Sequence, residues 1–396
     1  MKRLTSLAMA GLLALGIAGL AGSSDQARAE DPIVIGAAIA LSGFVQPYDD
    51  GPLKGAQLAI ADINAKGGVL GRQLSIVTAD TKSDPAQGTN AAIEVLEQGA
   101  EMVIVTCDFD FGAAAALQAS AMGKVTFSSC AGDPKFGVQG IGPLAYTMAL
   151  GTPAQGATLA EWAFKEKGWR KVYVEMDSMV EYFKSLCANF KVRWEELGGE
   201  IVGEDVYNFA EVKTFEGQVT RMKASDTADF VFLCAATFDG PALIKQARAA
   251  GVNTPILASE SMDGAFWLEA VPNLSEFYLG VYGSMFGNDP DPKINKYVAD
   301  FTAMHGAAPI TAHSLTGYSL IEAWAMAAER AGSLDPDAIR QELDKFSNEN
   351  LLIGATSFSP DLHINLYRGL QIMEVQNGKH APITRYTAEK VPPITF

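Results

Sequence analysis

The segment of residues 31–68 restricts the fold more than any other part of the sequence. It opens with the apolar run IVIGAAIA at 33–40, and a short run rich in Ile and Val is typical of a strand covered on both faces in a parallel sheet. An extended loop at 42–48 follows, and from Leu53 apolar residues recur at helical spacing. The segment therefore predicts strand, loop and helix. The loop lies at the carboxyl end of the strand, where open α/β sheets bind their ligands.

The same alternation of apolar strand and amphipathic helix continues along the chain. It predicts strands at residues 73–79, 102–106 and 125–128, with helices at 84–99 and 112–122. A second series predicts strands at 171–176, 201–207, 230–233 and 256–258, with helices at 154–167, 181–197, 215–225 and 240–251. Beyond 278–284 the chain turns helical at 295–305, 312–330 and 335–346, and 367–375 is strand-like. Because 396 residues exceed one ordinary core, we predict an α/β fold of two doubly wound, Rossmann-like lobes with a ligand cleft between them.

Residues 1–29 predict a signal peptide. A short basic start precedes an apolar stretch at 7–22, and Ala27-Arg28-Ala29 forms a small-x-small cleavage site. A transmembrane anchor is the alternative, but glycines interrupt the stretch and the cleavage pattern follows at once. No cysteine lies near the cleavage site, so nothing supports a lipid anchor. We expect a soluble protein exported to the periplasm.

Charge and motif content exclude several functions. The net charge of −16 repels phosphate backbones, so we expect no nucleic-acid partner. The four histidines have no metal-like spacing, and three lie in late segments that we expect to be peripheral. The sequence has no Walker A loop, G-x-S-x-G elbow or H-E-x-x-H motif. We therefore expect no enzymatic activity, catalytic residue, metal or cofactor.

Several segments together resemble one protein family. They are LSG at 41–43 with Tyr48, KGAQLAIADINAKGGVLGRQL at 54–74, DTKSDPAQG at 80–88 and IKQARAAG at 244–251. This combination is similar to the Leu/Ile/Val-type periplasmic solute-binding proteins, which are the type I receptors of ABC importers. The resemblance covers most of the chain and implies the two-lobed fold of these receptors, with three crossings between the lobes, near residues 148, 284 and 356.

The resemblance also implies domains and a function. Lobe 1 would comprise residues 30–148 plus 285–356, and lobe 2 residues 149–284 plus 357–396. The protein would clamp a small amino acid or amino-acid-like solute between the lobes and deliver it to an ABC permease in the inner membrane. Two alternatives stay open: the ligand is an aromatic or other carboxylate that lacks an amine, or the protein is a ligand-sensing subunit for a membrane receptor.

Two strand-end loops of the first lobe are candidate ligand contacts. DFDFG at 108–112 joins a buried strand to a helix start, and Cys130, Ala131 and Gly132 follow the next strand. Free N–H groups at a helix start favour an oxygen-rich ligand group, so we expect these small residues and Asp110 to hold such a group. The alternative is that Asp108 or Asp110 is an N-cap. Leucine-binding relatives carry serines in the first loop and Ala-x-Thr in the second; their replacement here predicts a larger, more aromatic or differently held ligand.

Other candidate contacts lie elsewhere in the chain. Glu260 falls where relatives use a glutamate to pair the ligand's ammonium, and an exposed helix-start glutamate is the alternative. Tyr48 matches the family's cleft tyrosine, and Tyr182 lies at a loop-to-helix junction of the second lobe; either residue can instead be ordinary core. Ala236 stands where relatives have a tyrosine, which Phe238 can replace from nearby. We expect Tyr48, Phe109 and Tyr182 to pack the rest of the ligand.

Four cysteines allow two disulfides in an exported protein. Cys107 and Cys130 end two strands that should be neighbours, so their pairing is geometrically reasonable. Cys187 with Cys234 is less constrained, since a helix face and a strand end need not meet. Buried free thiols remain the alternative.

Overall fold

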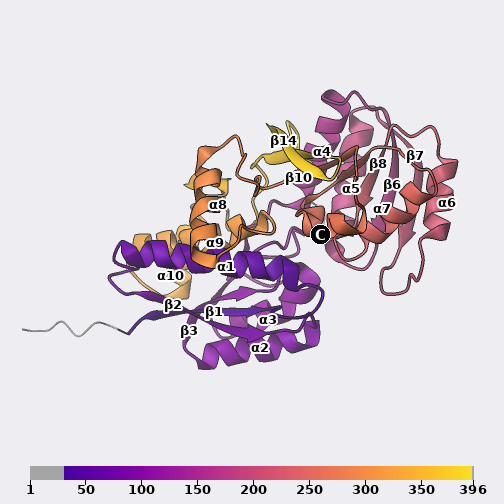
Figure 1. Ribbon diagram of the computed structural model, residues 1–396. Coiled ribbons are helices and arrows are strands. Elements are labelled where there is room, and N and C mark those ends of the chain that lie inside the picture. The colour runs from indigo at the N-terminus through magenta and orange to yellow at the C-terminus, as the bar shows by residue number, and fades with distance from the viewer. Residues whose placement is uncertain (1–30, 395–396) are drawn as a thin grey trace, which may run out of the picture. The chain divides into compact units, whose positions relative to one another are not determined.

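The structure, a computed structural model, describes residues 31–394. It contains two large β-sheets with helices packed on both faces, so the predicted α/β fold of two lobes is confirmed (Figure 1). No helix among these residues is long and apolar enough to cross a membrane. Residues 1–29, which the sequence predicts to be a signal peptide, lie outside the described residues.

The first lobe is built on a sheet of five parallel strands. In spatial order they are β2 (Leu74–Asp80), β1 (Ile33–Ile39), β3 (Ala100–Val105), β4 (Val125–Ser128) and β5 (Ala145–Thr147). Its helices are α1 (Gln46–Ala65), α2 (Pro85–Glu97), α3 (Phe109–Ala121), α8 (Pro292–His305), α9 (His313–Ala331) and α10 (Pro336–Leu343). A small hairpin of β11 (Glu349–Leu351) and β12 (Gly354–Thr356) adjoins α9.

Both faces of β1 are covered, which explains its unbroken apolar sequence. Ile35 and Ile39 belong to the core that includes α1 and α9, whereas Ala38 packs with α2 and α3. In the sheet centre Gly36 lies so close to α2 that an added Cβ would come within 2.8 Å of Val95. The strand therefore reads as a continuous hydrophobic run because neither face meets water.

Helices α1 and α9 come from distant parts of the chain and pack closely, indigo beside orange in Figure 1. Glycines make this contact possible. A Cβ on Gly55 would lie 2.1 Å from the backbone oxygen of Ser314, and one on Gly317 would lie 2.0 Å from that of Pro52. This packing fixes the start of α9 beside the start of α1, and both helix starts contribute to the pocket described below.

The second lobe is built on a seven-stranded mixed sheet. In spatial order its strands are β14 (Lys379–Tyr386), β13 (Leu370–Gln376), β10 (Phe277–Val281), β9 (Ile256–Ala258), β8 (Phe230–Cys234), β6 (Lys171–Asp177) and β7 (Glu200–Tyr207). The five strands from β10 to β7 are parallel, and β13 and β14 are antiparallel. Its helices are α4 (Thr152–Lys165), α5 (Glu181–Glu196), α6 (Glu216–Ala224) and α7 (Gly240–Ala249), with short 3-10 helices η1 (Glu260–Met262) and η2 (Phe266–Ala270).

Three connections join the lobes: from β5 to α4, from β10 to α8 and from β12 to β13. The first and third run side by side, because Leu150 and Asn365 form a parallel bridge and the N–H of Gly151 donates to the Asn365 carbonyl at 2.8 Å.

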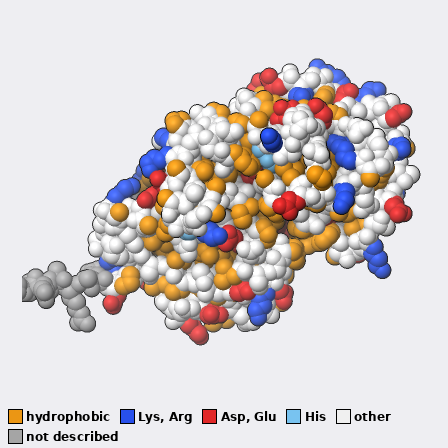
Figure 2. All heavy atoms as spheres, in the orientation of Figure 1, with side chains coloured by type: hydrophobic (Ala, Val, Ile, Leu, Met, Phe, Trp, Pro, Cys, Tyr) orange, Lys and Arg blue, Asp and Glu red, His pale blue; other side chains and the backbone are white. Residues whose placement is uncertain are grey.

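On the face shown in Figure 2, acidic and basic side chains are interspersed rather than separated by sign.

The sequence placed the start of α1 too late. The extended loop predicted at 42–48 is cut short, because α1 begins at Gln46 and has Pro47 in its first positions. Proline lacks the N–H that a first turn leaves unpaired, so it is well suited to that place. Pro52 lies inside the helix rather than near its start. As a result, Tyr48 projects from the first turn of a helix instead of from a flexible loop.

Candidate functional site

A pocket lies between the carboxyl ends of the strands of the two lobes. It encloses about 460 Å³ of empty space, counting space open to solvent. The first lobe contributes Val45, Tyr48, Cys107, Asp108, Phe111, Cys130 and His313, and the second Val180, Tyr182, Phe183, Ala236, Phe238, Glu260 and Ser261. Of the residues expected from the sequence, the structure brings Tyr48, Cys130, Tyr182, Ala236 and Glu260 together here; Phe109, Asp110, Ala131 and Gly132 lie outside this lining.

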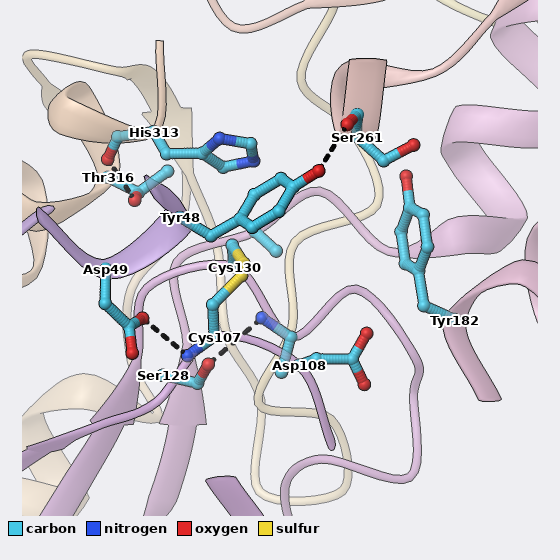
Figure 3. Close-up of a disulfide and its surroundings, with 12 residues drawn as sticks. Tyr48, Asp49, Cys107, Asp108, Ser128, Cys130, Tyr182, Ser261, His313 and Thr316 are labelled. Carbon is cyan, nitrogen blue, oxygen red and sulfur yellow. Dashed lines mark hydrogen bonds between the residues drawn. A yellow bond between two sulfur atoms is a disulfide. The ribbon is translucent and has the colours of Figure 1, made fainter. Parts of the chain in front are cut away.

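A disulfide between Cys107 and Cys130 joins the ends of β3 and β4 and forms part of the pocket wall (Figure 3). Asp49, which is 1% exposed, braces the same region. Its carboxylate accepts hydrogen bonds from the N–H groups of Ala40 at 2.7 Å and Cys107 at 2.8 Å. Burial raises the pKa of Asp49 to about 7. The ends of β1 and β3 are thus held in fixed register beneath the pocket.

Asp108 presents a carboxylate to the pocket from the N-cap position of α3. Its Oδ1 accepts from the N–H of Asp110 at 3.1 Å, as the N-cap alternative predicts for this aspartate. The residue has φ +78° and ψ 150°, a backbone conformation that few residues other than glycine adopt. Burial, and next the negative charge of Asp110, raise the pKa of Asp108 well above its usual value.

The loop after β4 is fixed by hydrogen bonds within the protein. The N–H of Ala131 donates to Ser128 Oγ at 3.0 Å, and its carbonyl accepts from Thr147 Oγ1 at 2.8 Å. Gly132 approaches the second lobe closely: a Cβ there would lie 2.9 Å from the Tyr182 ring. The small side chains of this loop therefore let the lobes come together.

Asp110 and Phe109 lie outside the pocket lining and have other contacts. The Asp110 carboxylate accepts from the N–H of Glu181 at 2.8 Å, so it caps helix α5 of the other lobe. Beside it, Lys135 of the first lobe forms an ion pair of 2.5 Å with Glu181. Phe109 packs with the core around α2 and α3, and Phe111 is the aromatic residue of this loop that lines the pocket. The helical turn that begins at Phe109 directs the two rings to different sides.

Tyr48 links the lobes through its hydroxyl. This hydroxyl donates to the Ser261 carbonyl at 2.8 Å and accepts from the N–H of Thr237 at 2.9 Å, and its oxygen is 2.7 Å from Thr237 Oγ1. The ring forms one side of the pocket. Burial raises the pKa of Tyr48, so the hydroxyl stays protonated and can donate.

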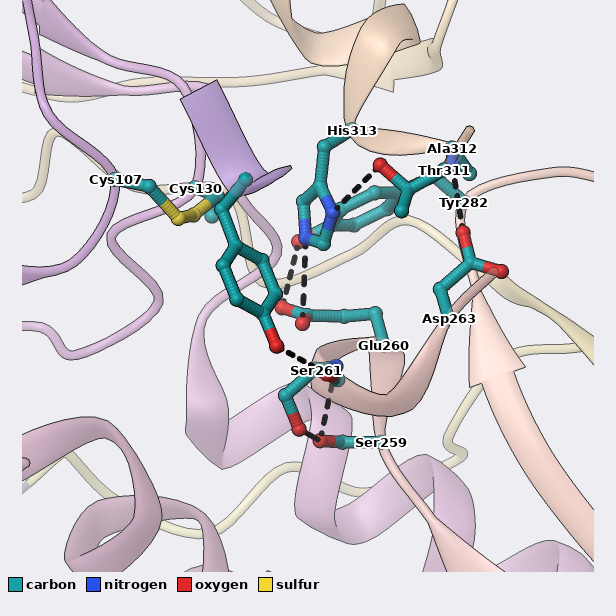
Figure 4. A network of polar contacts seen from close by, with 12 residues as sticks. Cys107, Cys130, Ser259, Glu260, Ser261, Asp263, Tyr282, Thr311, Ala312 and His313 are labelled. Carbon is teal, nitrogen blue, oxygen red and sulfur yellow. Dashed lines mark hydrogen bonds and ion pairs between the residues drawn. A yellow bond between two sulfur atoms is a disulfide. The ribbon is translucent and has the colours of Figure 1, made fainter. Parts of the chain in front are cut away.

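Glu260 sits in a buried network at the start of η1 (Figure 4). Its Oε1 accepts from Gln155 Nε2 at 3.1 Å and from the Tyr282 hydroxyl at 3.3 Å. Its Oε2 is 3.4 Å from His313 Nε2. The exposed-glutamate alternative is wrong, since Glu260 is only 3% exposed. The carboxylate faces the pocket but already has three partners.

His313 is the main residue of the site that the sequence did not predict. It is 1% exposed, which corrects the expectation of peripheral late histidines; His363 is equally buried. Burial lowers the pKa of His313, but the contacts with Glu260 outweigh burial and hold the pKa above its usual value of 6.5. The residue opens α9, which follows no strand of its own, so strand-end reasoning could not find it.

Aromatic side chains form much of the remaining wall. The Tyr182 hydroxyl donates to Gln155 Oε1 at 2.8 Å, which connects it to the Glu260 network. Phe238 and Ala236 both line the pocket. Phe44 makes edge-to-face contacts with Phe111 and Phe238, each with ring centroids 5.5 Å apart. Because Phe238 belongs to the second lobe, this aromatic group spans both lobes.

A second disulfide supports the wall from behind. It joins Cys187 in α5 to Cys234 at the end of β8, so the helix face and strand end do meet. The loop that contains Ala236 and Phe238 begins directly after Cys234. The N–H of Ala236 also donates to Asp239 Oδ1 at 2.8 Å, which tightens this turn.

The pocket lining contains more acidic than basic side chains. Two carboxylates and one histidine line it, and within residues 31–394 no lysine or arginine does so. In this described part of the chain, no group of His, Cys, Asp and Glu side chains is arranged to hold a metal ion. The arrangement suits an uncharged or cationic ligand with an apolar body.

Comparisons with known proteins point to one family. A family model described as "Periplasmic binding protein" matches residues 32–380. The Leu/Ile/Val-binding protein of Citrobacter freundii is 28% identical over 255 residues, which are 64% of this chain and 66% of that relative. This match therefore spans just under two thirds of the relative's length.

Solved structures share the fold. The branched-chain amino acid transporter substrate binding protein LivJ from Streptococcus pneumoniae, in complex with isoleucine, has a TM-score of 0.79 at 23% identity, covering 90% of this chain and 99% of that chain. A solute binding protein of an ABC transporter from R. palustris, in complex with benzoate, has a TM-score of 0.75 at 18% identity, covering 91% of this chain and 98% of that chain.

Proposed function

The chain belongs to the periplasmic binding protein family, and we propose that it binds a small amine-bearing solute, of the amino acid or amino-acid-like kind, between its two lobes. The observation that carries this proposal is the pocket itself. Both lobes supply its lining, each supplies a carboxylate, and no described lysine or arginine faces it. A carboxylate in a closed site needs a cationic or hydrogen-bonding partner, which an amine provides.

Binding is proposed to act through closure about the three connections. Ligand contacts that need both lobes favour the closed arrangement, which then presents a surface for an ABC permease in the inner membrane. Tyr48 and Asp110 support this mechanism, because each already hydrogen-bonds across the two lobes. The proposed lobe boundaries are those expected from the sequence, 30–148 plus 285–356 and 149–284 plus 357–396.

The proposed setting is the periplasm, after removal of residues 1–29. An acidic protein with interspersed surface charges is poorly suited to nucleic acid, so a permease is the proposed macromolecular partner. No catalytic role is proposed. A ligand-sensing subunit would use the same fold; neighbouring permease and ATPase genes would support transport over sensing.

An aromatic carboxylate without an amine is the second candidate. The aromatic wall of Phe111 and Phe238 favours it, and the R. palustris protein was solved with benzoate. Asp108 and Glu260 disfavour it, since a third carboxylate would enter a site that contains two.

A thermal-shift screen with amino acids, their amides, small amines and aromatic acids tests the proposal. A ligand at about 100 times its dissociation constant stabilises the folded state by about 2.7 kcal/mol. We expect a shift with at least one amine-bearing compound. A shift confined to acids that lack an amine would overturn the proposed ligand class and favour the second candidate.

A further inference from the structure

The two carboxylates of the pocket differ in how far the protein balances their charge. Glu260 lies against His313, and the pKa of that histidine is raised by this contact. Gln155 and Tyr282 add two hydrogen bonds to the same carboxylate. A protonated His313 leaves the Glu260 pair with no net charge. A ligand cation therefore gains little from Glu260 beyond a hydrogen bond.

Asp108 has no such partner. Within the described chain it forms no ion pair; its carboxylate accepts from the N–H of Asp110 and shares a side-chain hydrogen bond with the Asp110 carboxyl group. The nearby carboxylates of Asp110 and Asp133 have the same sign as its own. Lys135, the nearby cation, is paired with Glu181 at 2.5 Å. A positive charge at Asp108 would relieve this repulsion, and burial strengthens the attraction.

The part of the pocket beside Asp108 is unsuited to a ligand carboxylate. The N–H of Asp110 at the start of α3 is already taken by the side chain of Asp108, so this helix start offers one fewer donor to an anion. A carboxylate beside Asp108 would also meet a like charge in a site of low polarity, which is costly. Phe111 and Phe183 line the pocket, and the faces of aromatic rings attract organic cations.

We propose that the ligand is an organic cation without a free carboxylate, and that its ammonium group binds Asp108 rather than Glu260. This inference rests on the proposed function, since it names the ligand class of the same pocket. His313 acts as a positioning residue: by balancing Glu260 it leaves Asp108 as the anionic contact for the ligand.

Calorimetry with a matched set of compounds tests the ligand class. The set is L-phenylalanine, 2-phenylethylamine, L-phenylalaninamide and 3-phenylpropanoate, repeated with L-leucine, 3-methylbutylamine, L-leucinamide and 4-methylpentanoate. We expect an amine or an amide to bind at least about 10-fold more tightly than the parent amino acid, since one unpaired buried charge is costly. Tighter binding of the amino acid would overturn this inference and leave the proposed function standing. If only the acids bind, both the inference and the proposed function are overturned. If no amine and no amide binds, the inference is overturned.

The variant Asp108→Asn tests the contact. Asparagine keeps the N-cap and has nearly the same shape as aspartate, so the fold should survive. We expect affinity for the tightest amine to fall about 10- to 100-fold, which corresponds to one charge-assisted hydrogen bond. Asp84→Asn is the matched control, because Asp84 caps α2 in the same way and does not line the pocket; it should leave affinity unchanged. Equal affinity in Asp108→Asn and the control would overturn the assignment of Asp108.

Discussion

Asp108 and Glu260 lie in one pocket but in opposite electrostatic surroundings. Glu260 accepts two hydrogen bonds and faces a histidine, whereas Asp108 has two aspartates as its charged neighbours. The surroundings of Glu260 stabilise a carboxylate charge without a ligand. The surroundings of Asp108 become more favourable when a cation binds. The readiness of a carboxylate to bind a ligand therefore depends on its neighbours more than on its position in a family pattern.

Removing the Glu260 carboxylate should have the largest effect on stability. In Glu260→Ala the side chains of His313, Tyr282 and Gln155 lose a buried acceptor, so we expect unfolding free energy to fall by about 3–5 kcal/mol. Asp108→Asn should cost less than about 1 kcal/mol, because the cap is kept. Urea unfolding of both variants measures the difference. Equal losses would contradict the contrast between the two carboxylates.

A double-mutant cycle sharpens the comparison. Glu260→Gln and His313→Gln should be coupled by about 1–3 kcal/mol, since the two side chains are in contact. Asp108→Asn combined with His313→Gln should be additive within about 0.5 kcal/mol. Chemical unfolding of the single and double variants gives both couplings. A strong coupling of Asp108 to His313 would show that the histidine serves both carboxylates.

Stability should fall as pH rises from about 5.5 to 8. Burial raises the pKa of Asp49 to about 7 and that of Asp263 to about 6, and Glu260 raises the pKa of His313. The folded protein thus binds protons at these groups more tightly than the unfolded chain. The His313 contribution is complete below its unfolded pKa of 6.5 and is lost as pH rises through its higher folded pKa.

The pH dependence can be measured as the melting temperature at several pH values. Carboxylates with lowered pKa, such as Asp80 and Asp344, act mainly below about pH 4.5 and do not reverse the trend in this window. In the variant carrying both Glu260→Gln and His313→Gln the slope should be smaller. A melting temperature that rises across the window would show that these groups do not control stability there.

Lys135→Ala should have the smallest effect. Lys135 and Glu181 join the lobes near the pocket, but their side chains are 37% and 27% exposed. Partly exposed ion pairs contribute about 0.2–1 kcal/mol, so amine affinity should change by less than about 5-fold. Calorimetry on this variant checks the value. A much larger loss would mean that this ion pair, and not the pocket, determines closure.

Much of the fold is predictable because the sequence pattern of each core segment fits only one kind of secondary-structure element. The apolar run of β1 admits only a strand covered on both faces, and the structure covers it with α1 and α9 on one side and α2 and α3 on the other. Strand β14 was missed because its side chains alternate between exposed and half-buried and it contains Pro382. Such a strand at a sheet edge has no strong apolar signal.

The site is predictable in place but less so in detail. The topology rule located the strand-end loops, and Asp108, Cys130 and Ala236 follow from it. Which neighbour faces the pocket depends on side-chain direction, which separates Phe111 from Phe109. His313 reaches Glu260 only through the packing of α9 against α1, a contact between segments far apart in sequence.

A crystal structure of the protein with the tightest-binding amine of the panel tests the central claim most directly. The ligand nitrogen should lie about 3 Å from a carboxylate oxygen of Asp108, with the His313–Glu260 contact intact and aromatic faces around the ligand body. A nitrogen bound to Glu260, with His313 displaced and the ligand body directed toward Asp108, would contradict the claim.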